Sequence, residues 1–352
     1  MIRVPLLRLV AVGAAVLAGV VAAGPAPAAQ DNSYTVTPLV SNGGVPAPKT
    51  DPSLVNAWGL TAGPTTPWWV SDNGVDLSTL YNADGTKRPL EVHVAGGPTG
   101  DVFAAVPGNF PVGPTNAPAL FIFATERGTI LGWNQTVGTT AQVKVATPGA
   151  VYKGLAIATT ATGPQLYATD FVDGRVDVFN GQWQHVTTSG GFVDPSLPPG
   201  YGPFGIQTIG TRIFVTYAKQ SGGNDELHGQ GLGVVDAYDA DGHLLARVAQ
   251  HGQLNAPWGL ALAPANFGQF SGDLIVGNFG DGRINAYAEQ PDGSFERVGG
   301  FRRADGRAIV IDGLWALEFG HGAPNNGPTN TLFFTAGPND ESDGLFGTIT
   351  AD

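Results

Sequence analysis

The sequence contains no cysteine among its 352 residues. Disulfide bonds, thiol catalysis and cysteine-ligated metals are therefore excluded. A chain without disulfides must draw its stability from apolar burial, and a chain of this length can enclose a large core.

Basic residues are also scarce. The chain has 17 Lys and Arg against 29 Asp and Glu, which gives a formal net charge of −12 at pH 7. Nucleic acids and anionic membranes are bound through basic patches that replace counterions. We therefore expect neither as a partner.

Long stretches with helical spacing of apolar residues are absent as well. The apolar runs are short, rich in β-branched and aromatic residues, and separated by turns that draw on 52 Gly and 27 Pro. Such runs are typical of many short strands joined by tight turns. The sequence predicts an all-β protein.

The N-terminus has the pattern of a secretory signal peptide. Arg3 and Arg8 precede the apolar run "LVAVGAAVLAGVVAAG", and Ala26-Pro-Ala28 provides the small residues of a cleavage site. A lone membrane anchor is the alternative, but the run falls short of the ~20 strongly apolar residues of a stable span.

We therefore expect residues 1–28 to be removed and residues 29–352 to form a single secreted domain, a monomer without membrane insertion. Two of the 17 basic residues and none of the 29 acidic ones precede residue 29, so the mature net charge is −14.

The remaining chain contains six copies of one pattern. An apolar run begins at a glycine, a second run ends in an acid or amide, and a third ends in an aromatic residue before a turn, as in "GLAIATTATGPQLYATDFVDGRVDVF". Copies lie about 50 residues apart, and four strands per copy make a blade of a β-propeller. The equivalent points, called anchors below, are Gly59, Gly100, Gly154, Gly205, Gly259 and Ala316.

The sequence thus predicts a six-bladed β-propeller of four-stranded blades. The sixth copy stops after its third run, whereas a strand-like segment, residues 34–40, precedes the first copy. A propeller must hide its sheet edges. We expect this N-terminal strand to complete the last blade.

These copies, and "WGLALAPANFGQFSGDLIVGNFGDGRINAY" in particular, resemble NHL repeats. The whole chain is similar to a family of secreted bacterial propeller proteins, with a more distant similarity to gluconolactonases, paraoxonases, strictosidine synthases and an amidating lyase. The resemblance implies the propeller but no reaction, because NHL-like propellers include both binding modules and enzymes.

In a propeller, residues before each innermost strand and residues after each second strand converge on one end of the central channel. The first positions carry Asn56, Asn255 and Asp312, and the second include Glu126, Asp170 and Asn278. Carboxylate and amide oxygens suit a hard cation, so we predict these six residues as ligands of Ca²⁺. The alternative for each is capping of a turn by its own side chain.

The same rim predicts residues that contact a ligand, namely Trp58, Trp258, Trp315, Asn73 and Lys219. Packing between blades is the alternative for the tryptophans. Two loops add further acids, "SGGNDELHGQG" with His228 and "GPNDESDG" with Glu341, which are either rim ligands or solvated loop residues.

Catalytic signatures are missing: there is neither a Gly-x-Ser-x-Gly nor a His-Glu-x-x-His motif. Asp72, Asp170 and His251 are the candidates for proton transfer. The resemblance implies that gluconolactonase-like enzymes hold one divalent ion with a glutamate near the first strand. Here that position carries Asn56, and the nearest glutamate, Glu126, follows a second strand instead.

Two functions follow from these observations. The first is a secreted binding module that recognises a glycan, peptide or small molecule at the channel mouth, with or without Ca²⁺. The alternative is a Ca²⁺-dependent hydrolase, lactonase or lyase, in which the ion polarises a carbonyl group.

Overall fold

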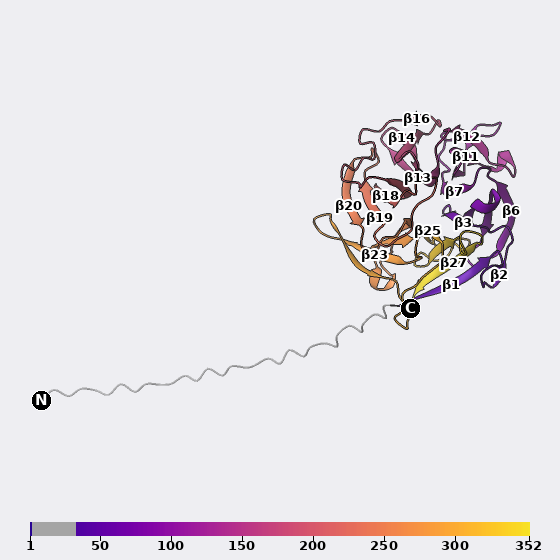
Figure 1. Cartoon of the computed structure of the whole chain (residues 1–352). Helices are drawn as coiled ribbons and strands as arrows, with labels where there is room; N and C mark the ends of the chain where they lie inside the picture. Colours follow the sequence, from indigo (N-terminus) through magenta and orange to yellow (C-terminus); the bar gives the residue numbers. More distant parts are fainter. Residues whose placement is uncertain (2–32) are drawn as a thin grey trace. The chain divides into compact units, whose positions relative to one another are not determined.

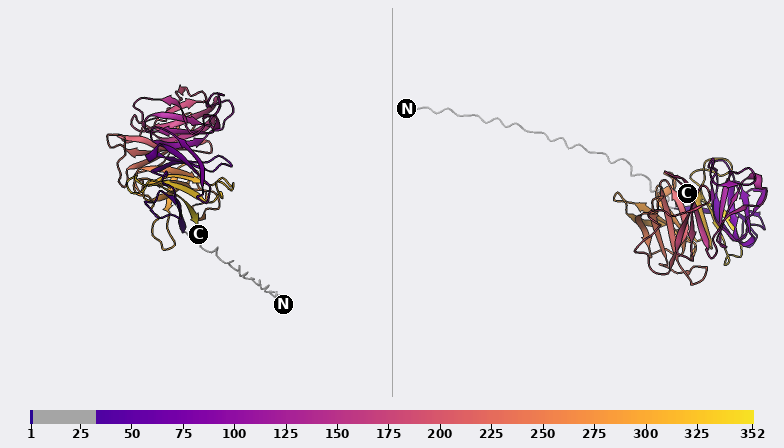
Figure 2. Two further views of the ribbon diagram at one scale, coloured as in Figure 1. Left: turned by 90° about the vertical axis from the view of Figure 1, so that its right-hand side faces the viewer. Right: turned by 90° about the horizontal axis from the view of Figure 1, so that it is seen from above.

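The structure, a computed structural model, describes residues 33–352 together with Met1, so the predicted signal peptide lies outside the described part apart from that residue. Within residues 33–352, six antiparallel sheets surround a central channel, and the chain passes from one sheet to the next around it (Figure 1). The prediction of an all-β, six-bladed propeller is confirmed. The views in Figure 2 show the resulting disc from two other directions.

Each of the first five sheets contains four strands in chain order from the channel outward. The first has β3 (Ala57–Thr61), β4 (Trp68–Asp72), β5 (Leu77–Tyr81) and β6 (Lys87–His93). The second has β7 (Pro98–Phe103), β10 (Phe121–Thr125), β11 (Thr129–Trp133) and β12 (Gln142–Ala146). The third has β13 (Tyr152–Thr160), β14 (Gly163–Asp170), β15 (Arg175–Asn180) and β16 (His185–Val186). The fourth has β17 (Tyr201–Ile209), β18 (Arg212–Lys219), β19 (Gly233–Tyr238) and β20 (Leu244–Gln250). The fifth has β21 (Pro257–Leu262), β22 (Leu274–Asn278), β23 (Ile284–Glu289) and β24 (Phe295–Gly300).

The sixth sheet combines strands from both ends of the described chain. β25 (Leu314–Phe319), β26 (Leu332–Ala336) and β27 (Leu345–Ala351) are followed outward by β1 (Tyr34–Ser41), which pairs antiparallel with β27. A two-residue strand, β2 (Lys49–Thr50), adds a fifth member that the repeat pattern did not predict. Outside the sheets, β8 (Pro111–Val112) and β9 (Ala117–Pro118) form a small hairpin.

The anchors lie on the six innermost strands and explain why the pattern repeats. A Cβ atom added to Gly205 would lie 2.1 Å from the carbonyl oxygen of Trp258 in the next sheet, and one added to Gly59 would lie 2.3 Å from that of Thr99. No side chain fits at such a distance. Glycine therefore allows neighbouring innermost strands to approach closely around the channel.

The core lies between the sheets. The second strands β4, β10, β22 and β26 are buried at every position, because a neighbouring sheet covers each of their faces. Between the first and second sheets, for example, Trp69 stacks on Phe121 with ring centroids 4.0 Å apart. Full burial of such a side chain contributes about 1.5–3 kcal/mol. Apolar burial of this kind is the source of stability expected for a chain without disulfides.

The disc has an upper and a lower face. The upper face is the one at which the innermost strands begin and the second strands end, and the lower face is the opposite one. Among the described residues, no helix has the length and hydropathy needed to cross a membrane.

Candidate functional site

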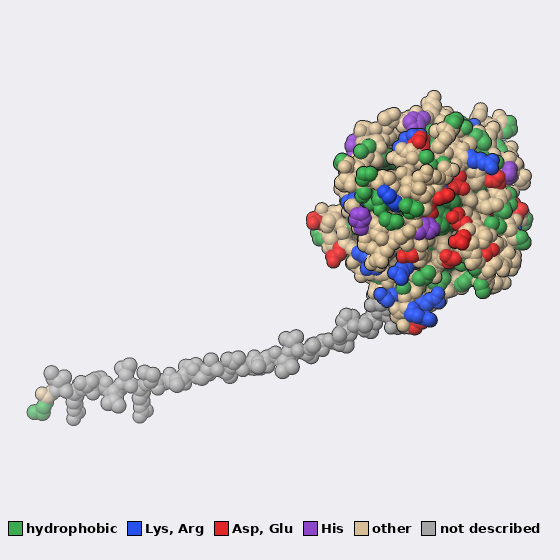
Figure 3. Space-filling view, in the orientation of Figure 1, with side chains coloured by type: hydrophobic (Ala, Val, Ile, Leu, Met, Phe, Trp, Pro, Cys, Tyr) green, Lys and Arg blue, Asp and Glu red, His purple; other side chains and the backbone are tan. Residues whose placement is uncertain are grey.

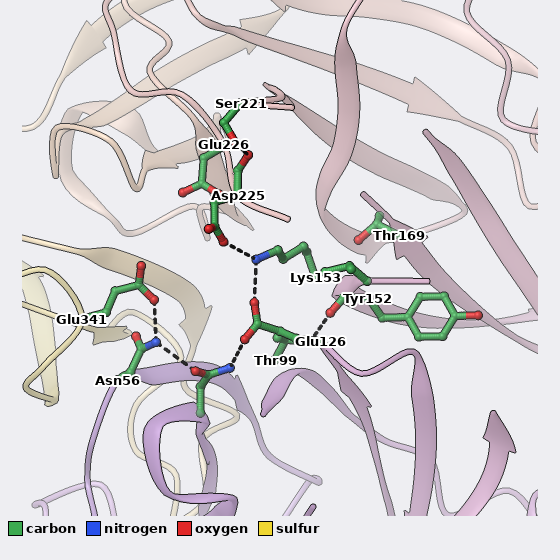
Figure 4. A network of polar contacts seen from close by, with 12 residues as sticks. Asn56, Thr99, Glu126, Tyr152, Lys153, Thr169, Ser221, Asp225, Glu226 and Glu341 are labelled. Atoms are coloured by element: carbon green, nitrogen blue, oxygen red, sulfur yellow. Dashed lines mark hydrogen bonds and ion pairs between the residues drawn. The ribbon is translucent and has the colours of Figure 1, made fainter. Parts of the chain in front are cut away.

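A chain of hydrogen-bonded side chains crosses the channel mouth on the upper face (Figure 4). The Asn56 amide Nδ2 donates to Glu341 Oε2 at 2.6 Å and to Asn73 Oδ1 at 3.2 Å. Asn73 Nδ2 in turn donates to Glu126 Oε2 at 3.1 Å. These side chains come from the first, second and sixth sheets, so the predicted convergence brings Asn56, Asn73 and Glu126 together. We call this group, with Lys153, Asp225 and Glu226 described below, the upper network.

Asn56 is held in place by its backbone. Its φ of 47° lies in the left-handed region, which asparagine tolerates better than most residues. Its N–H donates to the carbonyl of Asp343 at 2.9 Å, and its own carbonyl accepts from the N–H of Asn73 at 3.1 Å. The asparagine before β3 therefore fixes the loop between β26 and β27 against the first sheet.

Lys153 is the cation of the upper network. Its Nζ lies 2.7 Å from Glu126 Oε1 and 3.7 Å from Asp225 Oδ1, and its side chain is only 2% exposed. The ammonium group also lies over the ring of Trp58, 4.9 Å from its centroid. Burial by itself lowers the pKa of Lys153, but the charges of Glu126 and Glu226 outweigh this effect and hold the pKa above its usual value.

Two further groups carry the network into the loops. Burial raises the pKa of Glu341, the hydrogen bond from Asn56 lowers it, and the charge of Glu226 raises it again. His228 Nε2 lies 3.2 Å from Glu226 Oε1, and this contact raises the pKa of the imidazole. The two loop insertions thus belong to the rim.

An aromatic cluster forms the floor beneath this network. Trp58 and Trp315 stack with ring centroids 3.7 Å apart, and Phe279 also stacks on Trp315, with centroids 3.8 Å apart. Trp315 Nε1 donates to Asn56 Oδ1 at 2.9 Å, which joins the floor to the network. Trp58 and Trp315 pack against each other and are only 2% and 1% exposed. A ligand on the surface would therefore not reach them.

Sequence reasoning missed Lys153, although the repeats contain the signal. The residue directly before each anchor lies near the upper end of the channel, where a bulge such as that between Tyr152 and Leu155 interrupts the strand pairing. These equivalent positions hold Trp58, Thr99, Lys153, Phe204, Trp258 and Trp315. A lysine among mainly aromatic residues distinguishes the third copy.

Asp72 and Asp170, two of the catalytic candidates, do not reach the channel mouth. Asp72 is fully buried, neither of its carboxyl oxygens has a hydrogen-bond partner, and burial raises its pKa well above the usual value. Asp170 accepts from the Val151 N–H at 3.2 Å and pairs with Arg175 at 2.9 Å. The Asp170 carboxylate therefore caps the turn between β14 and β15, which agrees with the turn-capping alternative.

His251 and Lys219, which were expected at the rim, make local contacts. His251 Nδ1 lies 2.9 Å from the carbonyl oxygen of Gly231, in the loop that leads into β21. Lys219 Nζ donates to the carbonyl of Pro199 at 2.7 Å and lies over the ring of Tyr201. Neither side chain has a contact with the upper network.

The remaining predicted Ca²⁺ ligands are likewise separate. Asn255 Oδ1 accepts from the Gly229 N–H, Asn278 donates to the Gln253 carbonyl, and exposed Asp312 accepts from the Asn339 N–H. Each of these groups caps a loop. Within residues 33–352, no three His, Asp or Glu side chains are arranged to hold a metal ion.

Trp258 differs from the other two rim tryptophans. Its side chain is partly exposed, and it lines a small cavity of about 20 Å³ inside the channel. Its indole Nε1 is buried without a hydrogen-bond partner. Trp258 therefore lies within the channel, beneath the mouth.

Solved structures support the fold. A structural-genomics protein from Bacteroides thetaiotaomicron matches with a TM-score of 0.54 and 11% identity, over 90% of this chain and 76% of that one. Virginiamycin B lyase from Staphylococcus aureus matches with a TM-score of 0.50 and 12% identity, over 90% and 99% of the two chains. At these identities the likeness concerns the fold alone. A putative gluconolactonase matches at 0.39, too low to support an argument.

Sequence comparison gives a closer relationship. No protein-family model matches the chain. "Uncharacterized protein L690" of Acanthamoeba polyphaga mimivirus is 30% identical over 91% of this chain and 86% of its own length. "Uncharacterized protein R648" of the same virus is 31% identical over 91% of this chain and 81% of its own length. The chain belongs to the family of these two proteins.

Proposed function

We propose that the protein is a secreted binding module whose ligand contacts the upper network at the channel mouth. The observation that carries this proposal is the convergence of polar side chains from five sheets on one small surface. They are Asn56 and Asn73, Glu126, Lys153, Asp225 with Glu226, and Glu341. The predicted signal peptide supports a role outside the cell. If the protein is a monomer, as expected, it presents one such binding surface.

The charge of the network favours a ligand with positive charge or with many hydrogen-bond donors. Four carboxylates, those of Glu126, Asp225, Glu226 and Glu341, surround one lysine. Asp225 is 79% exposed at its side chain, so an approaching ligand can reach it. Figure 3 shows acidic side chains gathered around the centre of the face that it presents, with larger basic groups toward the edge. Among glycans, peptides and small molecules, cationic members are the preferred class.

Binding assays with matched probes test this proposal. Isothermal titration should detect a tetralysine peptide or a glucosamine tetramer, but neither tetraglutamate nor an N-acetylglucosamine tetramer. Asp225→Asn and Glu341→Gln should each weaken binding about two- to fivefold, as expected for a partly exposed charge pair. Asp292→Asn, in an exposed turn, is the control. Equal binding of cationic and acidic probes would contradict the proposal.

Calcium and the reaction that it would support stay predictions. Lys153 already places a positive charge between Glu126 and Asp225, where a Ca²⁺ ion would otherwise balance the carboxylates. The donor set therefore does not fit a resident ion at this point of the mouth. The hydrolase, lactonase or lyase alternative depends on such an ion elsewhere on the rim.

A further inference from the structure

The lower end of the channel opens into a pocket of about 320 Å³. The ends of β3, β7, β13, β17 and β25 line it, together with the connection that follows β25. Its titratable residues are Asp101, Glu318 and His321. A volume of this size suits a small organic molecule. We call this cavity the lower pocket.

Asp101 occupies a position that is aliphatic in the other five blades. The residue directly after each anchor lines the cavity inside the channel. The six residues are Leu60, Asp101, Leu155, Ile206, Leu260 and Leu317. A leucine would complete this apolar ring, so the carboxyl group is not explained by packing.

Within residues 33–352, the carboxyl group of Asp101 has no cationic partner. The residue is 7% exposed, and neither carboxyl oxygen has a hydrogen bond of good geometry. Burial raises its pKa well above the usual value, the charge of Glu318 raises it further, and the nearby Ser71 hydroxyl lowers it. Buried polar groups in proteins are nearly always paired, so an unpaired carboxyl group that lines a pocket indicates a missing partner.

Glu318 lies in the same pocket and is paired with His321. His321 Nε2 lies 2.9 Å from Glu318 Oε1, and this contact raises the pKa of the imidazole. Burial raises the pKa of Glu318, and the contact with His321 lowers it. The histidine thus balances one carboxylate, and Asp101 is left without a cation.

The other walls of the pocket differ in character. Thr61, Gln207 and Thr208 provide polar groups, whereas Phe103 and Ile157 provide an apolar surface. An adjoining hollow of about 580 Å³ shares Phe103, Ile157 and Thr208 with the pocket. A bound molecule could therefore place a polar group at Asp101 and a hydrocarbon part along these apolar residues.

We propose that the lower pocket binds a small organic cation of the primary amine class, with its ammonium group on Asp101 and its hydrocarbon chain against Phe103 and Ile157. An ammonium group donates up to three hydrogen bonds and balances the carboxylate charge. A metal ion fits less well, because the walls are partly apolar and residues 33–352 present no three-ligand cluster. This site is separate from the upper network, so either proposal can fail without the other.

Titration of the full protein with n-butylamine tests the proposal, with 1-butanol as the neutral probe of similar shape. We expect saturable binding of the amine and at least about tenfold weaker binding of the alcohol, because only the amine forms a charge-assisted hydrogen bond. Asp101→Asn should weaken amine binding by a similar factor. Asp292→Asn, the same chemical change in an exposed turn, should leave the affinity unchanged.

The proposal would be overturned by equal binding of amine and alcohol, by no binding of either, or by unchanged amine affinity in Asp101→Asn. Binding of CaCl₂ that excludes n-butylamine would assign the pocket to a metal ion and would also overturn it. Circular dichroism establishes that the variant is folded. If Asp101→Asn does not fold, Asp101→Leu provides the same readout, since it removes the same carboxyl group and completes the apolar ring.

Discussion

The two ends of the channel differ in how a buried charged side chain is balanced. At the upper end, Lys153 is buried among carboxylates and balances part of their charge. At the lower end, Asp101 is buried and has no cation beside it within residues 33–352. Each residue is the only charged member of its set of six equivalent positions, one directly before the anchors and one directly after them. A single substitution in one repeat of a symmetrical fold is thus enough to create a charged site.

Removal of the upper cation should have the largest effect. Lys153→Met leaves Glu126, whose side chain is 32% exposed, next to Asp225 and Glu226 without a counter-charge. Loss of one partner costs about 3–5 kcal/mol when the remaining charge is fully buried, so for the partly exposed Glu126 we expect a smaller loss of about 1–3 kcal/mol. Urea unfolding at pH 7 measures this loss. Lys144→Met, whose lysine lies over Trp183 at the surface, is the matched control.

A second substitution should restore part of this stability. In Lys153→Met with Glu126→Gln, the carboxylate that lost its partner is neutral as well. We expect a favourable coupling free energy of about 0.5–3 kcal/mol between the two changes in a double-mutant cycle. Strict additivity would show that the ion pair contributes nothing to the upper end.

The lower end should respond in the opposite direction. Asp101→Leu completes the aliphatic ring and removes a buried carboxyl group without a partner. An unsatisfied buried group costs about 1–3 kcal/mol, so the free energy of unfolding at pH 7 should rise by about this amount. The melting temperature measures the gain, and Leu155→Ala should lower it. A fall in stability on Asp101→Leu would mean that the carboxyl group has a structural role.

The gain from Asp101→Leu should depend on pH. The pKa of Asp101 is raised in the folded protein, so the folded state holds this proton more tightly than the unfolded state. The contribution of this group to stability is fully present below the unfolded pKa of about 3.9 and is lost as the pH rises through the folded pKa. The difference in melting temperature between Asp101→Leu and wild type should therefore grow from about pH 4 to pH 7. Because the pKa of Glu318 is also raised, Glu318→Gln should be measured beside it.

Calcium should have the smallest effect on the melting temperature. The informative comparison is between Lys153→Met and wild type. Without Lys153 the carboxylates of the upper end are unbalanced, so CaCl₂ should raise the melting temperature of Lys153→Met more than that of wild type. Addition of a chelator measures the reverse change. A larger response in wild type would place a Ca²⁺ site elsewhere on the rim.

The sequence was sufficient for the fold because the repeats carry it. Anchor glycines such as Gly205 permit the close approach of innermost strands, and this physical requirement recurs in five of the six blades. The meeting of Asn56, Asn73 and Glu126 was also predictable, since strand starts and strand ends share one face.

The rest of the site depended on the direction of individual side chains. Asp72 and Asp170 end their strands at the upper face, but their side chains are buried within the sheets, which strand position alone does not reveal. Lys153 was missed because it was read as part of a glycine motif. His321 was missed because it follows β25 in a long connection, far in sequence from Asp101.

A crystal structure of the protein soaked with n-butylamine tests the contrast between the two ends most directly. We expect electron density for the amine in the lower pocket, with its nitrogen within hydrogen-bonding distance of the Asp101 carboxyl group, and an unchanged Lys153 between Glu126 and Asp225. Density for the amine beside Glu126 and Asp225 at the upper end, with Lys153 displaced and an empty lower pocket, would contradict the account.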